Sequence, residues 1–455
     1  MYNKHQKNQK ALRRKNEGEA QQLPVRGNEL NIASHQLDSL PGSDKLMEEV
    51  CEKENLIQAL KKVKQNKGAP GIDGMTVDSL EPYLKKNWLR IKEQLLKGEY
   101  KPLPVKRIEI PKPGKGVRKL GIPSVIDRFI QQAILQPLQK RIDPTFSECS
   151  FGFRPGKSAH QAIAQAQIYI EEGYRFVVDI DLEQFFDRVN HDKLMSEMAK
   201  RISDKRILKI IRNYLKAGIL QNGVIILSEE GTVQGGPLSP LLSNVILDLL
   251  DKELEKRGHR FCRFADDCNT YVKSKRAGDR VMRSLEIFIN KRLKLKVNQE
   301  KSAVEKAYKR KFLGFSFTSA KIPKRRISPE SVKRFKTKIQ ELTKAGKGRS
   351  MKQVTTRLKE YLTGWLGYYG FCETESVLRK LESWVHRRIR CAYWKQWKTG
   401  PNRSKQLRKL GVGKQLARQT AGTNKGSWHT SMSPALSYAF PNAYFSKEFG
   451  LPNFC

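Results

Sequence analysis

The sequence predicts an α+β protein with a strongly basic surface. Short apolar stretches typical of strands are interspersed with helical patterns up to about residue 320, and only helical patterns follow beyond about residue 327. The chain has 455 residues and a formal net charge of +42. A positive excess of this size indicates a polyanionic partner: nucleic acid is the first candidate, and an anionic membrane surface is the second.

Several classes of protein are disfavoured by the composition. No stretch approaches the roughly 18 consecutive apolar residues of a membrane-spanning helix, and residues 1–22 lack the apolar core of a signal peptide. We therefore expect a cytoplasmic protein with no membrane partner. The 7 cysteines are scattered without a CxxC pair, so free thiols in a reducing compartment are expected in place of a zinc site or a disulfide framework.

The elements expected in the first part of the chain begin after a polar, basic tail at residues 1–44, which has the composition of a disordered segment. The apolar spacing that follows predicts helices over 46–63, a turn-rich loop at 66–74, a basic β-hairpin over 105–122 and a helix over 127–138. A buried strand is expected at 176–180. Two helices are expected within 192–217, with Ser203 as the N-cap of the second and Gly218 as its stop.

The second part begins with a strand, a Gly/Pro loop and a helix over 225–254. A strand–turn–strand at 262–272, a helix over 282–293 and a short strand at 312–318 follow. The remaining chain is helical, basic and aromatic. Residues 381–410, for example, hold nine Lys and Arg against one Glu, which favours contacts with nucleic-acid phosphates.

The stretch "CRFADDCNTYV" places Asp266 and Asp267 side by side in a strand-prone run. Two adjacent carboxylates there are costly unless a positive group stabilises them. An acidic pair by itself is typical of a solvated turn. Here, however, Asp179 and Asp181 come at the end of another apolar strand. Carboxylates on neighbouring strands suit Mg²⁺, and two such ions about 3.5–4 Å apart can clamp an in-line phosphoryl displacement.

A series of motifs in fixed order resembles the group II intron-encoded reverse transcriptases, also called maturases. The fingers blocks of that family resemble "NKGAPGIDG", "IPKPGKGVRKLGIPSVIDRFIQQAI" and "FSECSFGFRPGKSAHQAI". Motifs A to E resemble "DIDLEQFFDRVNHDKL", "GTVQGGPLSPLLSNVILDLLD", "CRFADDCNTYV", "LKVNQEKS" and "FLGFSF", and the thumb resembles "YLTGWLGYYGF". The resemblance covers about residues 46–400.

Two departures from the family pattern matter. Motif C usually begins with Tyr, where this chain has Phe264, which affects only a hydroxyl contact near the primer end. Many members also carry a His-Asn-His nuclease domain with clustered cysteine pairs. Because Cys372, Cys391 and Cys455 are isolated, we expect that domain to be absent.

The resemblance implies a right-hand polymerase that copies RNA into DNA and also binds a structured intron RNA to assist splicing and mobility. Its expected partners are intron RNA, template RNA, primer or target DNA and deoxynucleotides, and its protein partners are unknown. The expected domains are fingers and palm at 45–320, a helical thumb or X domain at 321–400 and a small basic nucleic-acid-binding module at 401–455.

The resemblance also implies roles for individual residues. Asp181, Asp266 and Asp267 would hold two Mg²⁺ ions as catalytic ligands, while Asp179 would support the strand or point elsewhere. Phe186 would pack under the nucleotide sugar and exclude a ribose 2′-hydroxyl. The alternative, an ordinary core phenylalanine, is a serious rival at Phe185.

Further nucleotide contacts are expected from the basic hairpin and the motif B loop. Lys112 and Arg118 flank the hairpin turn and would reach the triphosphate, although a solvated charged hairpin is the alternative. Gln234 and Gly235 open the motif B loop, where a residue without a side chain allows close backbone approach.

Contacts with nucleic acid are expected at six positions. Arg154 and Lys157 lie in "GFRPGKS", which lacks Walker spacing and reads as template-facing fingers. The other four are Trp365, Arg387, Arg388 and Arg390. For Trp365, packing in a helical core is the simpler interpretation.

Three alternative functions remain open. A splicing factor with an inactive polymerase is disfavoured by the intact carboxylates. A reverse transcriptase of a defence or diversity-generating lineage is disfavoured by the thumb motif "GWLGYYG", and an RNA-copying RNA polymerase by Phe186.

Overall fold

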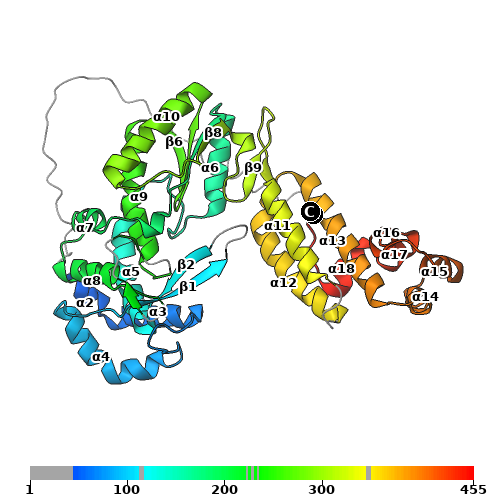
Figure 1. The fold of residues 1–455 in the computed structure, drawn as a ribbon, viewed down its shortest axis with the longest axis horizontal. Helices are drawn as coiled ribbons and strands as arrows, with labels where there is room; N and C mark the ends of the chain where they lie inside the picture. The colour runs from blue at the N-terminus through cyan, green and yellow to red at the C-terminus, as the bar shows by residue number, and fades with distance from the viewer. Residues whose placement is uncertain are drawn as a thin grey trace, which may run out of the picture. The chain divides into compact units, whose positions relative to one another are not determined.

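The computed structural model describes residues 45–111, 117–221, 224–226, 230–232, 235–344 and 350–454. The predicted tail at 1–44 lies outside the described residues. The α+β class is confirmed, because three sheets occur among the described residues together with helices along the whole described chain (Figure 1). None of the described helices is long and apolar enough to cross a membrane.

The first part of the chain contains a mixed sheet with helices around it. The helices are α2 (Leu46–Val50), α3 (Lys53–Asn66), α4 (Leu80–Leu96), α5 (Val125–Ile142), α7 (His191–Ala199) and α8 (Lys205–Lys216). The strands are β1 (Val105–Pro111), β2 (Val117–Ile122), β4 (Ile219–Gln221) and β5 (Val224–Ile226), in the order β2-β1-β4-β5. The predicted hairpin is confirmed: β1 and β2 are antiparallel, with Lys106 opposite Ile122 and Pro111 opposite Val117.

A second, antiparallel sheet carries the predicted carboxylates, and we call it the central sheet. Its strands are β3 (Phe176–Ile180), β6 (Arg260–Phe264), β7 (Asp267–Val272) and β8 (Ala303–Lys306), in the order β6-β7-β3-β8. β6 and β7 form a tight hairpin in which Phe264 is opposite Asp267. The strand predicted at 176–180 and the strand–turn–strand at 262–272 are both confirmed.

Alternate residues of β3 enter different cores, because neighbouring side chains of a strand point to opposite faces. Val178 and Ile180 join a core with Leu285 and other residues of α9 (Ser239–Lys256) and α10 (Lys275–Phe288). Val177 joins the other core, which includes residues of α6 (Ala159–Glu171). Asp179 shares the face of Val177, so this acid points away from the α9–α10 core.

The last part of the chain is helical apart from a small two-stranded sheet, β9 (Phe315–Phe317) with β10 (Arg325–Ile327). The helices are α11 (Pro329–Leu342), α12 (Met351–Tyr369), α13 (Glu375–Gln396), α14 (Gly400–Lys409), α15 (Lys414–Ala421), α16 (Ser427–Thr430), α17 (Pro434–Ala439) and α18 (Asn442–Phe449). One hydrophobic core joins α11–α13 to the C-terminal segment. In it, the ring of Trp365 lies 4.3 Å from that of Phe335 and 6.1 Å from that of Phe454.

Two boundary predictions were wrong. The N-cap of α8 is Asp204, whose side chain accepts a hydrogen bond from the Arg206 amide, so Ser203 lies one residue outside. The helix expected at 282–293 begins earlier, at Lys275, where the Ser274 side chain caps it. Its first turn is polar and basic, which conceals the start from an argument based on apolar spacing. A π-helical turn at Ile289–Leu293 follows α10.

Candidate active site

Three of the predicted carboxylates come from two neighbouring segments of the central sheet. Asp181 follows the end of β3, Asp266 lies in the β6–β7 turn, and Asp267 begins β7. Desolvation and the negative charges of Asp266, Asp179 and Asp181 raise the pKa of Asp267 to about 7. Asp267 is nevertheless classed among the exposed residues. Its carboxyl group therefore has protein atoms around it, but an ion from solvent can still reach it.

The two acids near the end of β3 have different partners. Arg310 donates a hydrogen bond from Nε to Asp179 Oδ2 at 2.9 Å, while burial raises the pKa of Asp179 above its usual value. Asp181 Oδ2 lies 3.5 Å from Lys301 Nζ, and the Lys301 side chain is 64% exposed. Asp179 is therefore fixed by a guanidinium, whereas Asp181 faces a solvated ammonium that can move away.

The segment at 296–302 fixes the backbone of Asp181. The Asp181 amide donates to Ser302 Oγ at 3.0 Å, and the Asn298 amide donates to the Asp181 carbonyl at 2.8 Å. This segment belongs to the predicted motif D. Its side chains Lys301 and Ser302 were not predicted as site residues, because nothing in the local pattern shows that the segment lies beside Asp181.

The donor set suits a hard divalent cation, although the described residues do not form a closed metal site. No group of three or more His, Cys, Asp or Glu within the described ranges is arranged to hold a metal ion. Carboxylate oxygens are the ligands that Mg²⁺ prefers. Desolvation and the nearby carboxylates together raise the pKa of Asp267, and the repulsion among these carboxylates is of the kind that a bound cation relieves.

The predicted sugar gate, Phe186, lies in the short segment that follows Asp181. Phe186 is half-buried and Phe185 is only 2% exposed, with an edge-to-face contact of 5.2 Å between the ring centroids. The Phe186 carbonyl accepts a hydrogen bond from the Thr232 amide at 2.6 Å. Phe185 is therefore the core residue of the pair, and Phe186 keeps part of its ring accessible.

The predicted triphosphate contacts are only partly described. Lys112 and Gln234 lie outside the described residues; Arg118 belongs to β2, but its side chain is also outside them. Gly235 has φ +124°, and a Cβ there would lie 2.5 Å from the Gly121 carbonyl oxygen. The backbone of Gly235 thus lies close to that of Gly121 in β2, while its contact with a nucleotide stays a prediction.

A small pocket between this hairpin and the segment after β3 contains residues that the sequence analysis missed. Its volume is about 230 Å³, and it is lined by Arg107, Lys119, Gln184, Asp187 and Thr232 among others. Neighbouring side chains of a strand point to opposite faces. The positions of Arg107 and Lys119 along the two strands of the hairpin could therefore have indicated which face they share.

The two predicted template contacts each form an ion pair within the protein. Arg154 is 8% exposed and donates to Asp143 Oδ1 at 3.0 Å and to the Ser147 carbonyl at 2.6 Å. Lys157 forms an ion pair with Glu148 at 2.5 Å. Both stabilise the loop before α6, so we no longer assign Arg154 to nucleic acid.

The four predicted contacts in the helical region mainly organise the protein. Trp365 is 8% exposed in the core, so the packing interpretation applies and its assignment to nucleic acid is corrected. The Arg387 guanidinium lies 3.8 Å from the Trp428 ring centroid, and Arg390 Nη2 donates to the Phe440 carbonyl at 2.6 Å. Arg388 donates to Thr343 Oγ1 at 3.0 Å. These arginines attach neighbouring segments to α13.

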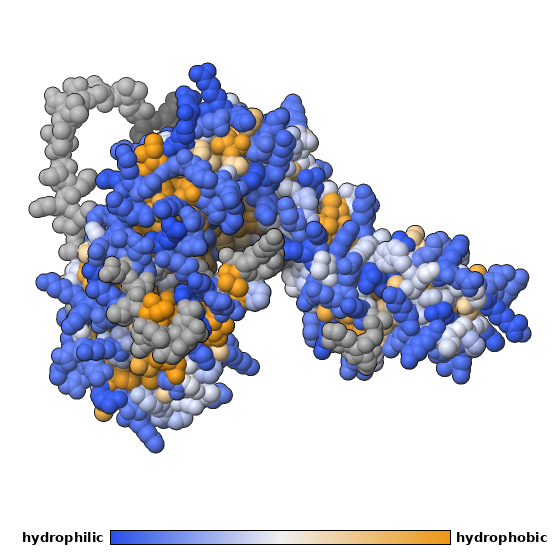
Figure 2. All heavy atoms as spheres, viewed as in Figure 1, coloured by the Kyte–Doolittle hydropathy of each residue, from blue (hydrophilic) through white to orange (hydrophobic). Residues whose placement is uncertain are grey.

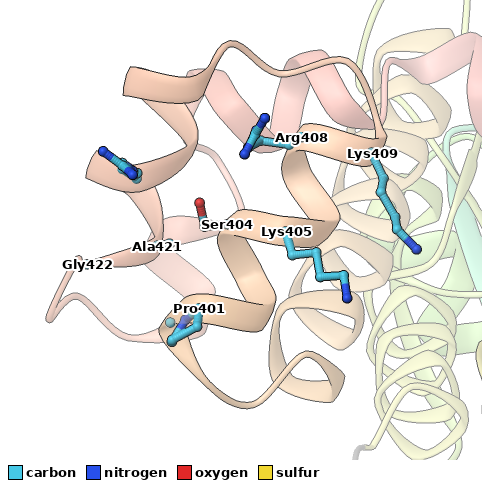
Figure 3. A pocket seen from close by; sticks show the side chains of 9 residues that line it. Pro401, Ser404, Lys405, Arg408, Lys409, Ala421 and Gly422 are labelled. Carbon is cyan, nitrogen blue, oxygen red and sulfur yellow. The ribbon is translucent and has the colours of Figure 1, made fainter.

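A basic pocket lies between α14 and α15 (Figure 3). It measures about 720 Å³ and is lined by Gly400, Pro401, Ser404, Lys405, Arg408, Lys409, Arg418, Ala421 and Gly422. Its lining holds four cationic side chains and no carboxylate. Arg408 projects into the space between the helices. The side of the α14–α15 region that is visible in Figure 2 is mostly hydrophilic. The sequence predicts a basic module here, but its pattern does not identify these residues.

Comparison with known proteins defines the class of the chain. Residues 110–317 match the family described as reverse transcriptase (RNA-dependent DNA polymerase), and residues 332–411 match the group II intron, maturase-specific domain. The predicted resemblance is thereby confirmed: one segment of the chain is similar to reverse transcriptases, and a later segment is similar to the maturase-specific domain of group II introns.

Individual proteins also match parts of the chain. Protein YkfC of Escherichia coli K12 is 36% identical over 219 residues, which cover 47% of this chain and 58% of that protein. The group II intron-encoded protein LtrA of Lactococcus lactis is 37% identical over 188 residues, which cover 41% of this chain and 31% of LtrA. The chain thus spans less than two thirds of either relative. Among solved structures, a partial Cas6-RT-Cas1–Cas2 complex matches with 25% identity and a TM-score of 0.36, over 54% of this chain and 42% of that one.

Proposed function

We propose that the protein is an RNA-directed DNA polymerase of a group II intron, and that it also binds the intron RNA to assist splicing and mobility. The observation that carries the proposal is the convergence of Asp181, Asp266 and Asp267 on the central sheet, inside the residues that match a reverse transcriptase. Convergent carboxylates are required for metal-assisted nucleotidyl transfer.

In the proposed reaction, Asp181, Asp266 and Asp267 would hold two Mg²⁺ ions. Bound there, the ions would activate the primer 3′-hydroxyl and neutralise the charge on the triphosphate and the leaving pyrophosphate. The protein orients the reactants: the Ser302 and Asn298 contacts fix Asp181, and the half-exposed ring of Phe186 would lie under the deoxyribose. Lys112, Arg118 and Gln234 remain predicted triphosphate contacts.

The proposed domains follow the family pattern. Residues 45–320 would form the fingers and palm, 321–400 the thumb, and 401–455 a basic module. The basic pocket between α14 and α15 supports a role of this module in binding the phosphates of target DNA or intron RNA, because its four cations face no lining carboxylate. Lys157 remains a proposed contact with nucleic acid, through its partly exposed side chain. A cytoplasmic ribonucleoprotein is the expected setting.

Two alternatives are less well supported. A splicing factor without polymerase activity has no need for a cluster of carboxylates in which desolvation and mutual repulsion raise the pKa of Asp267. A reverse transcriptase of a defence or diversity-generating lineage is disfavoured by the match of residues 332–411 to the maturase-specific domain.

The test is primer extension on an RNA template with the full chain and with a double variant, Asp266→Asn and Asp267→Asn. We expect Mg²⁺-dependent DNA synthesis by the natural protein, no synthesis by the variant, and intron-RNA affinity that differs by no more than a few-fold. RNA binding without DNA synthesis by the natural protein would favour the splicing-factor alternative. Parallel loss of RNA affinity in the variant would mean that the pair has a structural role.

A further inference from the structure

Arg263 is a fully buried cation immediately before the turn that carries the catalytic pair. It lies in β6, and its side chain is 0% exposed. Nε donates to Asp251 Oδ1 at 2.7 Å and Nη2 to Asp251 Oδ2 at 2.5 Å, which makes a bidentate pair with α9. Asp251 is equally buried. A buried pair of this kind is tolerated only when its remaining hydrogen-bonding groups are also satisfied.

The other guanidinium hydrogens are all used. Nη1 donates to Asn244 Oδ1 at 2.9 Å and to the Ala265 carbonyl at 3.0 Å. Nη2 also donates to Ser150 Oγ at 2.7 Å. With the two bonds to Asp251, the five N–H groups of an arginine are matched. A lysine, with one compact ammonium, cannot reach these acceptors together.

The turn itself is strained and needs support. Ala265 has φ +57°, in the first of the two turn positions between Phe264 and Asp267, where glycine is favoured. Such a conformation is unfavourable for a residue with a side chain and persists when its surroundings determine it. Arg263 supplies one of those constraints through the Ala265 carbonyl.

The neighbouring loop supplies another constraint. A Cβ on Gly152 would lie 2.2 Å from the Ala265 amide nitrogen, so only glycine permits this approach. The Gly152 carbonyl accepts from Asn244 Nδ2 at 2.9 Å, and Asn244 in turn accepts from Arg263. The turn, the loop at 149–152 and helix α9 are thus joined through one guanidinium.

We propose that Arg263 and Asp251 are positioning residues that hold the Ala265–Asp266 turn in its strained form, so that Asp266 and Asp267 face Asp181 before metal and nucleotide bind. The inference rests on the proposed polymerase function. It also explains how the chain tolerates two adjacent acids at this place: the buried cation organises their backbone, while its own bidentate pair is made with Asp251 on a separate helix.

The test must separate positioning from folding, because removal of one partner leaves an uncompensated buried charge. Arg263→Lys keeps the charge and loses the bidentate geometry. The double variant Arg263→Met with Asp251→Leu removes both charges, an exchange that is often neutral for stability. The matched control is Arg201→Lys. Arg201 forms an ion pair at 2.6 Å with Asp248, a buried acid of α9 like Asp251. The Arg201 guanidinium lies over the Phe146 ring.

Four quantities are measured on the full chain: thermal unfolding, single-nucleotide addition, intron-RNA affinity, and Mn²⁺ binding without nucleic acid. In both Arg263 variants we expect Mn²⁺ affinity and kcat to fall by about 10- to 100-fold, with KM for deoxynucleotide and intron-RNA affinity within a few-fold. Arg201→Lys should change none of them. Partial recovery of kcat when Ala265→Gly is added to Arg263→Lys would confirm that the turn transmits the effect.

The inference would be overturned if the folded double variant bound Mn²⁺ as tightly as the natural protein does. It would also be overturned if Arg201→Lys lost as much Mn²⁺ affinity and kcat as Arg263→Lys. If the double variant does not fold, the Arg263→Lys and Arg201→Lys comparison decides alone. Failure of the polymerase function is distinguishable, because the natural protein would then add no nucleotide while the Mn²⁺ comparison still reports on the turn.

Discussion

Arg310 donates to Asp179 at 2.9 Å, while Asp181, two residues further along, faces the exposed ammonium of Lys301 at 3.5 Å. The two acids of motif A therefore differ in what a metal would have to displace. A guanidinium that is hydrogen-bonded to a carboxylate is hard to replace, whereas a solvated lysine can move away at small cost.

This difference predicts unequal effects of the two isosteric substitutions. Asp181→Asn should reduce primer extension by at least about 100-fold, because a metal ligand is removed. Asp179→Asn should reduce it by no more than about tenfold, in the range of an indirect change. The measurement is single-turnover extension at saturating deoxynucleotide. An equal reduction in both variants would assign Asp179 to the metal site.

The phenylalanine pair predicts a change in sugar selection. Phe186→Ala should increase the use of ribonucleotides relative to deoxynucleotides by at least tenfold, about 1.4 kcal/mol, because the accessible part of its ring would no longer exclude the 2′-hydroxyl. The measurement is kcat/KM for each nucleotide on the same primer. Phe185→Leu is the matched control, since Phe185 is 2% exposed and should change stability without changing selection. Unaltered selection in an active Phe186→Ala enzyme would show that another residue is the gate.

The parts of the fold that depend on local patterns could be predicted from the sequence. The strand at 176–180 and the hairpin at 105–122 agree with the structure, because alternation, apolar runs and Pro/Gly turns are properties of a few consecutive residues. The carboxylate triad could be assigned only through the order of motifs. Its supports could not be assigned, because Arg263 meets Asp251, and Arg310 meets Asp179, across separate elements.

The partners of basic side chains could not be predicted from the sequence either. Arg154 and Arg390 looked like nucleic-acid contacts by charge and neighbourhood, yet both donate to backbone carbonyls inside the protein. A guanidinium can satisfy internal acceptors as readily as phosphates. Only the packing of the chain distinguishes these cases.

The basic pocket predicts a salt-dependent interaction with nucleic acid. Replacement of Lys405, Arg408 and Arg418 by Ala should weaken duplex binding at low salt. The slope of log K against log[salt] should decrease by about one for each phosphate that the variant no longer neutralises. Extension of an annealed primer should largely survive. The measurement is a salt titration by fluorescence anisotropy.

A matched control distinguishes the pocket from general charge. Lys425 and Lys447 are exposed and lie outside the pocket, so Lys425→Ala with Lys447→Ala should change the slope less for each charge removed. Equal changes per charge would mean that binding depends on net charge alone.

His386 predicts how the C-terminal helix α18 responds to acid. The ring is 8% exposed, stacks on Phe445 with 4.5 Å between centroids, and lies 3.2 Å from Asn442 Oδ1 through Nδ1. Burial, together with the positive charge of Arg390, lowers its pKa to about 4, against an opposing hydrogen bond with Asn442. The folded protein therefore keeps His386 neutral, whereas the unfolded chain binds a proton below about pH 6.5. Stability from this site is complete above about pH 6.5 and decreases as the pH falls toward 4, by up to about 3 kcal/mol.

We therefore expect hydrogen exchange in α18 to accelerate between pH 7 and pH 5, after correction for intrinsic exchange, more than in α7, whose Leu194 and Met198 belong to the core around α9 and α10. His386→Gln keeps a hydrogen-bonding group opposite Asn442 and cannot be protonated, so it should remove this pH dependence even if it lowers stability at pH 7. Hydrogen exchange measured by mass spectrometry on both proteins at the two pH values makes the comparison. The same acceleration of α18 in His386→Gln as in the natural protein would assign the acid sensitivity to another group.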